Sequence, residues 1–290
     1  MSFSQSIAEN KFTLIAEIDP PKGTHLETFL EQARVLKSRV DALAVTDSEH
    51  AVMRMSPIAP CLKLISENIE PIMITNARDK NRISLQAEML SAWTLGIKTI
   101  VCKMGIDPDW GDQPMVKSSG DLDTMKMVSC ATSLNAGKDL AGEMLDGNTD
   151  FNIGVSIDPS DDIKINKFLA GSLTDFAELG VSFVFLGPTY DKHIVELFSE
   201  KAETTRIKLF TSLMLLKSVA MIRYLDNLPG IPAIPHEFLK IMMDAPIKSE
   251  AGLEIAAGYF KDIRQYCNGV VIQSLGWGNH LSHFLDDIGR

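Results

Sequence analysis

The sequence has few cysteines, and they are far apart. Its 290 residues include four of them, with no C-x-x-C pair: Cys61, Cys102, Cys130 and Cys267. This spacing is typical of neither a zinc site nor a disulfide framework. We therefore expect buried thiols in a reducing compartment.

Long apolar runs and an excess of basic charge are also missing. No apolar run approaches the ~18 residues of a membrane span, and residues 1–11 lack the apolar segment of a signal peptide. The net charge is −10. Such a charge disfavours nucleic acid or an anionic membrane as a partner, because binding to phosphates requires clustered Lys and Arg. We expect a cytoplasmic protein whose partner is a small molecule.

Several catalytic and cofactor motifs do not occur. Neither G-x-G-x-x-G after a strand nor G-x-x-x-x-G-K-[ST] is present, so a Rossmann or P-loop cofactor is not expected. The G-x-S-x-G elbow of many hydrolases is missing too. The histidines show no H-E-x-x-H spacing, and we expect no metal site.

The sequence does contain eight short β-rich runs separated by longer amphipathic ones. The predicted strands are Thr13–Ile18, Ala42–Thr46, Pro71–Thr75, Thr99–Lys103, Phe151–Ile157, Ser182–Gly187, Lys208–Met214 and Gly269–Leu275. Helical spacing of apolar residues is seen in Leu26–Leu36, Ile83–Leu95, Ile165–Leu179 and Gly252–Tyr266. This alternation predicts an α/β fold, a single (β/α)8 TIM barrel that forms one domain over residues 1–290. A doubly wound sheet stays open, because closure of a sheet is not visible in a sequence.

In either architecture the chemistry is expected beyond the C-terminal ends of the strands. The segments that follow the first four predicted strands are polar: Glu17–Lys22, Thr46–His50, Asn76–Arg82 and Lys103–Pro108. Residues 104–120 are rich in Gly, Pro and Asp and exceed the usual connection length, so they predict a functional loop.

Glu17 stands inside an apolar strand that would otherwise be buried. A carboxylate is rarely buried without a partner. If Glu17 points into the barrel mouth, desolvation raises its pKa and makes it a usable proton donor. The alternative is a structural carboxylate paired with Lys22 or Arg78.

The charged cluster Arg78–Arg82 precedes the helix that is expected to begin near Ile83. Asp79 is a candidate N-cap that would accept hydrogen bonds from free backbone amides. Capping alone explains most of this cluster.

Taken together, these motifs resemble the methylenetetrahydrofolate reductase family, especially the short forms of anaerobic bacteria. The matching pieces are Glu17 with Pro20–Thr24, Val45–Asp47, Arg78–Arg82 with Leu85–Gln86, Gly111–Pro114, Asp121–Asp123, Leu134–Asp139, Ile153–Gly154, Tyr190–Asp191, Leu216–Ser218, Pro229–Ile231 and Leu275–Trp277. No single piece is specific for this family. The occurrence of all of them in the same order over nearly the whole chain is specific for it.

The resemblance implies a barrel with FAD at its C-terminal face. It also implies hydride transfer from NAD(P)H through the flavin to methylenetetrahydrofolate, yielding methyltetrahydrofolate. Carried onto this sequence, it makes Glu17 the acid that opens the folate ring. The positions that it assigns to cofactor binding are Thr46, Asp47, Lys103, Met104, Gly105, Tyr190 and Lys217.

Asp107 is the second catalytic candidate. The family has Thr-Gly-Asp after the fourth strand, where this chain reads Met104-Gly105-Ile106, so Asp107 comes one position late. A shift of one residue in an extended segment turns a side chain to the other face. Asp107 is therefore either a solvent-facing loop residue or, if Pro108 bends the turn, a carboxylate at the barrel mouth.

Other departures from the family lie on the flavin side. Gly187 stands where relatives have a glutamine, and Phe176 replaces a lysine that approaches the FAD phosphates. Met73 and Ile74 fall where relatives have polar flavin neighbours. Each lost charge-assisted contact costs about 1.5–3 kcal/mol. We therefore expect FAD to be bound weakly or not at all.

Three functions follow from these residues. The first is an oxidoreductase that interconverts 5,10-methylene- and 5-methyltetrahydrofolate, with NAD(P)H as electron donor and FAD as an uncertain cofactor. The second is a tetrahydrofolate-dependent methyl or one-carbon transferase without redox chemistry, which explains a retained proton donor beside lost flavin contacts. The third, a non-catalytic partner subunit, is disfavoured because the strand-end loops are so polar. A homo-oligomer or a complex with a partner subunit stays open.

Overall fold

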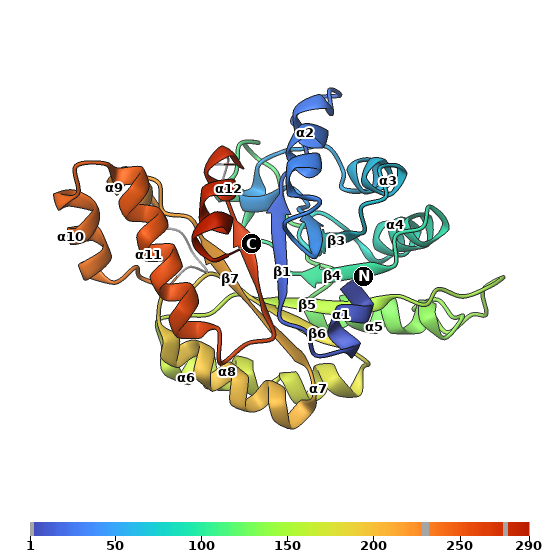
Figure 1. The fold of residues 1–290 in the computed structure, drawn as a ribbon. Helices are drawn as coiled ribbons and strands as arrows, with labels where there is room; N and C mark the ends of the chain where they lie inside the picture. Colours follow the sequence, from blue (N-terminus) through green and yellow to red (C-terminus); the bar gives the residue numbers. More distant parts are fainter. Residues whose placement is uncertain (1–2, 228–231, 275–277, 290) are drawn as a thin grey trace.

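The computed structural model describes residues 3–227, 232–274 and 278–289. Eight parallel strands form a closed barrel in chain order, with helices around it (Figure 1). The strands are β1 Thr13–Ile18, β2 Ala42–Val45, β3 Pro71–Asn76, β4 Thr99–Lys103, β5 Asn152–Ile157, β6 Phe183–Leu186, β7 Lys208–Met214 and β8 Gly269–Gln273. The predicted (β/α)8 barrel is thereby confirmed, and a doubly wound sheet is excluded.

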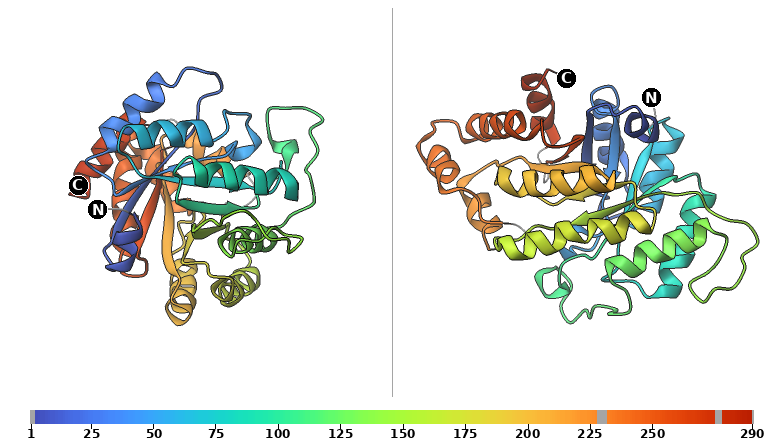
Figure 2. Two further views of the ribbon diagram at one scale, coloured as in Figure 1. Left: turned by 90° about the vertical axis from the view of Figure 1, so that its right-hand side faces the viewer. Right: turned by 90° about the horizontal axis from the view of Figure 1, so that it is seen from below.

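Helices follow the strands and cover the outside of the barrel (Figure 2). They are α1 Phe3–Ala8, α2 Glu27–Leu36, α3 Ile58–Ser66, α4 Arg82–Thr94, α5 Thr124–Asn135, α6 Ile163–Gly171, α7 Leu173–Glu178, α8 Lys192–Thr205, α9 Val219–Leu225, α10 His236–Asp244, α11 Lys248–Ile263 and α12 Gly278–Asp287. Two 3-10 turns, η1 Glu49–Ala51 and η2 Pro108–Trp110, lie after β2 and β4. In Figures 1 and 2, α9 and α10 project to one side of the barrel, beyond α11.

Two predictions about helices were wrong. The helix expected over Ile165–Leu179 is divided into α6 and α7 at Ser172, where Gly171 and Ser172 are weak helix formers. The N-cap of α4 is Asn81, whose side chain accepts hydrogen bonds from the amides of the second and third residues of the helix, at 3.1 and 2.9 Å. Asp79 lies too far before the helix to reach these amides.

Strand side chains alternate between two cores, as expected for period-two geometry. On β1, Leu14, Ala16 and Ile18 face the helices, whereas Ile15 belongs to the cluster inside the barrel. The ring of Phe3 in α1 lies 5.1 and 5.5 Å from the rings of Phe183 and Phe210 and fills the N-terminal end of the barrel. The same alternation places Glu17, which follows Ala16, inside the barrel at its opposite, C-terminal end.

Three of the four cysteines are buried, as expected. Cys61, Cys102 and Cys130 are buried and Cys267 is partly buried, and none is in a disulfide.

No helix in the described ranges is long and apolar enough to cross a membrane. The matched pieces Pro229–Ile231 and Leu275–Trp277, and the last residue of the strand expected over Gly269–Leu275, lie outside the described residues.

Candidate active site

Polar side chains gather at the C-terminal mouth of the barrel. Glu17 is in register with Gln273 of the neighbouring strand β8, and Lys103 ends β4. A cavity of about 200 Å3 opens there; its lining residues are Glu17, Ile18, Asp19, Gln32, Glu49, His50, Arg54 and Ser274. The polar segments that follow the first two predicted strands therefore contribute to the lining of this cavity, and their functional role stays a prediction.

Glu17 has no basic side chain bonded to it among the described residues. Gln273 Nε2 donates to its Oε2 at 3.2 Å. The two expected partners bind other carboxylates, Lys22 that of Asp112 and Arg78 that of Asp79. The structural ion pair considered for Glu17 is therefore excluded.

The environment of Glu17 favours its neutral form. Burial and the nearby charge of Glu49 raise the pKa of Glu17 to about 8, although Lys103 opposes this shift. At neutral pH the side chain is then a carboxylic acid that can donate a proton. Burial and a neighbouring carboxylate are the usual means by which proteins produce such an acid.

Beside Glu17 lies a buried ion pair. Lys103 Nζ is 2.6 Å from Glu49 Oε1 and 3.9 Å from Asp158 Oδ1. Burial alone would lower the pKa of Lys103, but the carboxylates of Asp158 and Glu49 raise it above its ordinary value. Burial would likewise raise the pKa of Glu49, and Lys103 lowers it. The mouth therefore combines an acid with a carboxylate and an ammonium that both stay charged.

The segment that carries Glu49 has an uncommon backbone. Ser48, His50 and Ala51 have φ values of 46°, 54° and 56°, in the left-handed region that side chains other than glycine disfavour. A Cβ added to Gly111 would lie 2.1 Å from the carbonyl oxygen of Ala51, so the loop after β4 packs directly on this segment. Strained backbone of this kind persists only where its surroundings hold it, and it is common at functional sites.

Thr46 and Asp19 form a second polar group at the mouth. Thr46 is fully buried, and its Oγ1 donates to Asp19 Oδ1 at 2.6 Å. Arg54 Nη2 lies 3.4 Å from Asp19 Oδ2, and its Nη1 donates to the carbonyl of Pro20 at 3.0 Å. Thr46, predicted to contact a cofactor, holds Asp19 beside the cavity.

Two predicted binding residues make structural contacts instead of facing the cavity. Asp47 pairs with Lys80 and accepts a hydrogen bond from the amide of Asn76 at 3.1 Å. Tyr190 is buried against Tyr259, and its hydroxyl donates to the carbonyl of Met214. Binding roles for Asp47 and Tyr190 stay predictions.

The remaining predicted residues lie at strand ends, outside the lining of the mouth cavity. Met104 is exposed, and Gly105 packs on the Cβ of Arg78 with a φ of 80°. Lys217 is exposed in the segment after β7. Asp107 is exposed too, and its side chain caps η2 by accepting a hydrogen bond from the amide of Asp109 at 2.9 Å. The structure therefore favours the loop role of Asp107, and its catalytic role stays a prediction.

Two positions at which this chain departs from the family's expected flavin contacts, Gly187 and Phe176, are closely packed. A Cβ added to Gly187 would lie 2.6 Å from Asp158 Oδ1, so Asp158 fills the space that a longer side chain at 187 would need. Phe176 is buried in the core with only 5% of its surface exposed. The carboxyl groups at the mouth are offset by basic side chains, since Lys103 lies beside Glu49 and Asp158, and Arg54 lies beside Asp19.

Sequence reasoning missed two residues that complete this site. Glu49 was noted only as part of a polar strand-end segment, and Asp158 not at all. Asp158 directly follows β5, and Glu49 follows β2 within four residues. Their position after strand ends was the available signal, but their shared partner Lys103 becomes visible only in three dimensions.

A closed (β/α)8 barrel with a neutral carboxylic acid and a buried ion pair at its C-terminal mouth defines an enzyme of the TIM-barrel class. The family described as Methylenetetrahydrofolate reductase matches residues 2–275, and the chain belongs to this family. The resemblance inferred from the sequence is thereby confirmed. Membership supports an oxidoreductase-like function related to folate. No curated protein matches the chain.

Solved structures with the same fold have little sequence in common with this chain. EDTA monooxygenase (EmoA) from Chelativorans sp. BNC1 is 12% identical, with a TM-score of 0.56 over 96% of this chain and 92% of its own. Long-chain alkane monooxygenase (LadA) is 11% identical, with a TM-score of 0.54 over 95% and 89%. A tryptophan synthase chain from M. tuberculosis is 11% identical, with a TM-score of 0.52 over 99% and 92%. At these identities the similarity shows the fold alone.

Proposed function

We propose that this protein reduces 5,10-methylenetetrahydrofolate to 5-methyltetrahydrofolate, or catalyses the reverse reaction. Glu17 is the general acid, and a reduced nicotinamide, NADH or NADPH, is the hydride donor. The observation that carries the proposal is the partly buried Glu17 at the barrel mouth, with a pKa raised to about 8 and a hydrogen bond from Gln273. Family membership supports the folate substrate.

The proposed reaction begins with the proton of Glu17. Its transfer to N10 of the folate breaks the bond between N10 and the methylene carbon, and leaves that carbon as an iminium on N5. Hydride from C4 of the reduced nicotinamide then adds to the methylene carbon, and the nicotinamide is oxidised. The products are an N5-methyl group, a protonated N10 and a Glu17 carboxylate, which regains its proton from water.

Lys103 and Glu49 support this cycle without contacting the reacting atoms. The ammonium of Lys103 stabilises the Glu17 carboxylate that proton transfer produces. Its partner Glu49 offsets that positive charge before transfer, so Glu17 is not ionised prematurely. The two charges thus keep the proton affinity of Glu17 near neutrality, where a general acid is most effective.

We propose further that FAD binds weakly or not at all, because Asp158 occupies the space beside Gly187 and the buried Phe176 cannot supply the charge of a lysine. Methylenetetrahydrofolate-dependent oxidation of NADH or NADPH by the purified protein, with and without added FAD, tests the proposal. The expected result is 5-methyltetrahydrofolate formed in equal amount to oxidised nicotinamide, without a requirement for FAD.

The position of Asp158 beside Gly187, which leaves little room for a flavin contact there, favours a second candidate function. A tetrahydrofolate-dependent methyl or one-carbon transferase needs a proton donor such as Glu17 but no hydride donor. Formation or consumption of 5-methyltetrahydrofolate with a methyl acceptor or donor, and without nicotinamide oxidation, would identify this function.

A further inference from the structure

The outer face of α6 and α7 has features that the proposed reaction does not use. The two helices lie end to end on the outside of the barrel (Figures 1 and 2), and Ser172 between them keeps helical backbone angles, φ −64° and ψ −14°. Five exposed residues follow one another here at spacings of four and three: Lys164, Phe168, Gly171, Asp175 and Glu178. This spacing places them in one stripe along the two helices, which we call the outer stripe.

The centre of the outer stripe combines a protruding ring with a flat position. Phe168 exposes 77% of its surface, and Ile163 and Ile165 of the same helix expose 49% and 47%. At Gly171 an added Cβ would meet nothing within 4 Å, so the surface above this residue is open. Isolated apolar side chains are ordinary on protein surfaces, whereas several on one helix indicate a surface that binds another.

The charges of the outer stripe form two halves of opposite sign. Lys164 lies before the apolar centre, whereas Asp175 and Glu178 lie after it. None of these three residues is in an ion pair within the described part of the chain. Asp161 and Asp162, which precede the helix, accept hydrogen bonds from backbone amides. A stripe that is basic at one end and acidic at the other complements itself when two copies run antiparallel.

We propose that the outer stripe is the contact face of a symmetric dimer of this chain, in which the helices of the two copies run antiparallel. Phe168 of one copy then lies on Gly171 of the second copy, and Lys164 pairs with Asp175 of the second copy. A single two-fold axis between positions 169 and 170 produces both contacts, and each occurs twice. A second copy fits this face better than an anionic membrane, which the acidic half would repel.

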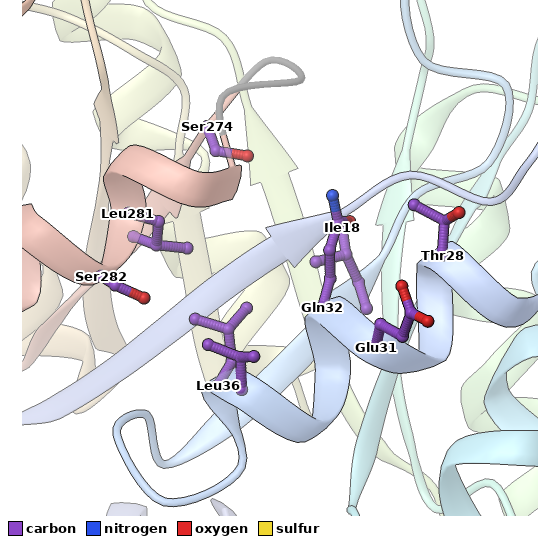
Figure 3. A pocket seen from close by; sticks show the side chains of 9 residues that line it. Ile18, Thr28, Glu31, Gln32, Leu36, Ser274, Leu281 and Ser282 are labelled. Atoms are coloured by element: carbon purple, nitrogen blue, oxygen red, sulfur yellow. The ribbon is translucent and has the colours of Figure 1, made fainter.

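The proposed interface is small and leaves the barrel mouth accessible. At 1.5 Å per residue, α6 and α7 together are about 24 Å long, so the buried area is at the low end for specific interfaces and we expect a Kd on the order of micromolar. Because α6 follows β5, it lies across the closed barrel from α2 and α12. These two helices flank a cavity of about 370 Å3 beside the mouth (Figure 3). The dimer is therefore independent of the proposed function.

Sedimentation equilibrium of the purified full-length protein, from about 1 to about 100 µM, tests the proposal over the range expected for so small an interface. Phe168→Glu removes the ring, and Ile83→Glu, at a residue of α4 that is 75% exposed, is the matched control. Lys164→Glu sets two carboxylates against each other across the axis. Lys164→Glu combined with Asp175→Lys restores opposite charges there. The two positions are too far apart along the helices to pair within one chain.

The wild type and Ile83→Glu should dimerise with similar Kd values, and Phe168→Glu should raise the Kd at least about thirtyfold. Lys164→Glu should raise it about three- to thirtyfold, and the double variant should return it to near the wild-type value. A wild type that stays monomeric at about 100 µM would overturn the proposal. So would a dimer that Phe168→Glu does not weaken, or a double variant that associates no better than Lys164→Glu.

Discussion

At the scale of single residues, the proposed chemistry depends on the proton of Glu17. Glu17→Gln keeps the size of the side chain and its hydrogen bonding but removes the proton. Loss of a positioned general acid costs about 10²–10⁴-fold in turnover. We therefore expect kcat to fall by about this factor, with an unchanged circular dichroism spectrum. Glu9→Gln, on an exposed glutamate, is the control and should leave kcat unchanged; normal turnover of the Glu17 variant would make Glu17 a structural carboxyl group.

The raised pKa of Glu17 also predicts how stability depends on pH. The folded pKa is about 8 against an ordinary 4.5, so folding favours the protonated form. This contribution is fully present below about pH 4.5, declines as the unfolded carboxyl ionises, and is lost by about pH 8. Glu17→Gln cannot ionise and should exceed the wild type in free energy of unfolding by about 1–3 kcal/mol at pH 8, a value reduced for the partial exposure of the group. Urea unfolding should show no such difference near pH 4.

Asp107 offers a test between its two roles. Because its exposed side chain caps η2, we expect Asp107→Asn to leave the Kd of 5-methyltetrahydrofolate unchanged. Ile106→Asp restores a carboxylate at the family's position and is the companion variant. If Asp107→Asn instead weakens folate binding by about 1.5–3 kcal/mol, Asp107 reaches the barrel mouth in solution and the catalytic prediction is correct.

The sequence allowed some of these residues to be predicted and not others. A carboxylate in an otherwise apolar strand is a clear sequence signal, so the position of Glu17 in the barrel mouth could be predicted. That Lys22 and Arg78 are not its partners could not be predicted, because Lys22 binds Asp112 of a distant loop and Arg78 binds its neighbour Asp79. The ion pair of Lys103 joins segments 54 residues apart and leaves no local pattern.

At the scale of elements, two loops of the mouth depend on one close contact. Gly111 lies against the carbonyl of Ala51, and a methyl group there would be 2.1 Å from that oxygen. Gly111→Ala should displace the left-handed segment that holds Glu49, lower the free energy of unfolding by about 1–3 kcal/mol and reduce kcat. Gly23→Ala, where an added Cβ meets nothing within 4 Å, is the matched control. Equal unfolding energies for the two variants would show that the loops do not depend on each other.

Strand positions were easier to predict than helix details. Every strand of the barrel is buried on both faces and reads as an apolar run, and such runs locate β1 to β8 well. Helix boundaries depend on single residues instead. Gly171 and Ser172 interrupt an otherwise continuous amphipathic pattern, and Asn81 rather than Asp79 reaches the amides of α4. Both features require the local backbone geometry.

At the scale of the whole molecule, the barrel does not by itself indicate a reaction. Chains described as monooxygenases and a tryptophan synthase share this fold at 11–12% identity. Function in such barrels is set by the loops at the C-terminal face. The family narrows the function to folate-related chemistry, and the acid and the ion pair at the mouth support the proposed one-carbon reduction with a nicotinamide.

The most direct test of this account follows one hydrogen atom. The purified protein would be given 5,10-methylenetetrahydrofolate and NADH or NADPH deuterated at C4 on the transferred side, without added flavin, and the folate product would be analysed by mass spectrometry. The account predicts 5-methyltetrahydrofolate with one deuterium in its methyl group and an equal amount of oxidised nicotinamide. A methyl product without deuterium, or no methyl product while the folate binds, would contradict it.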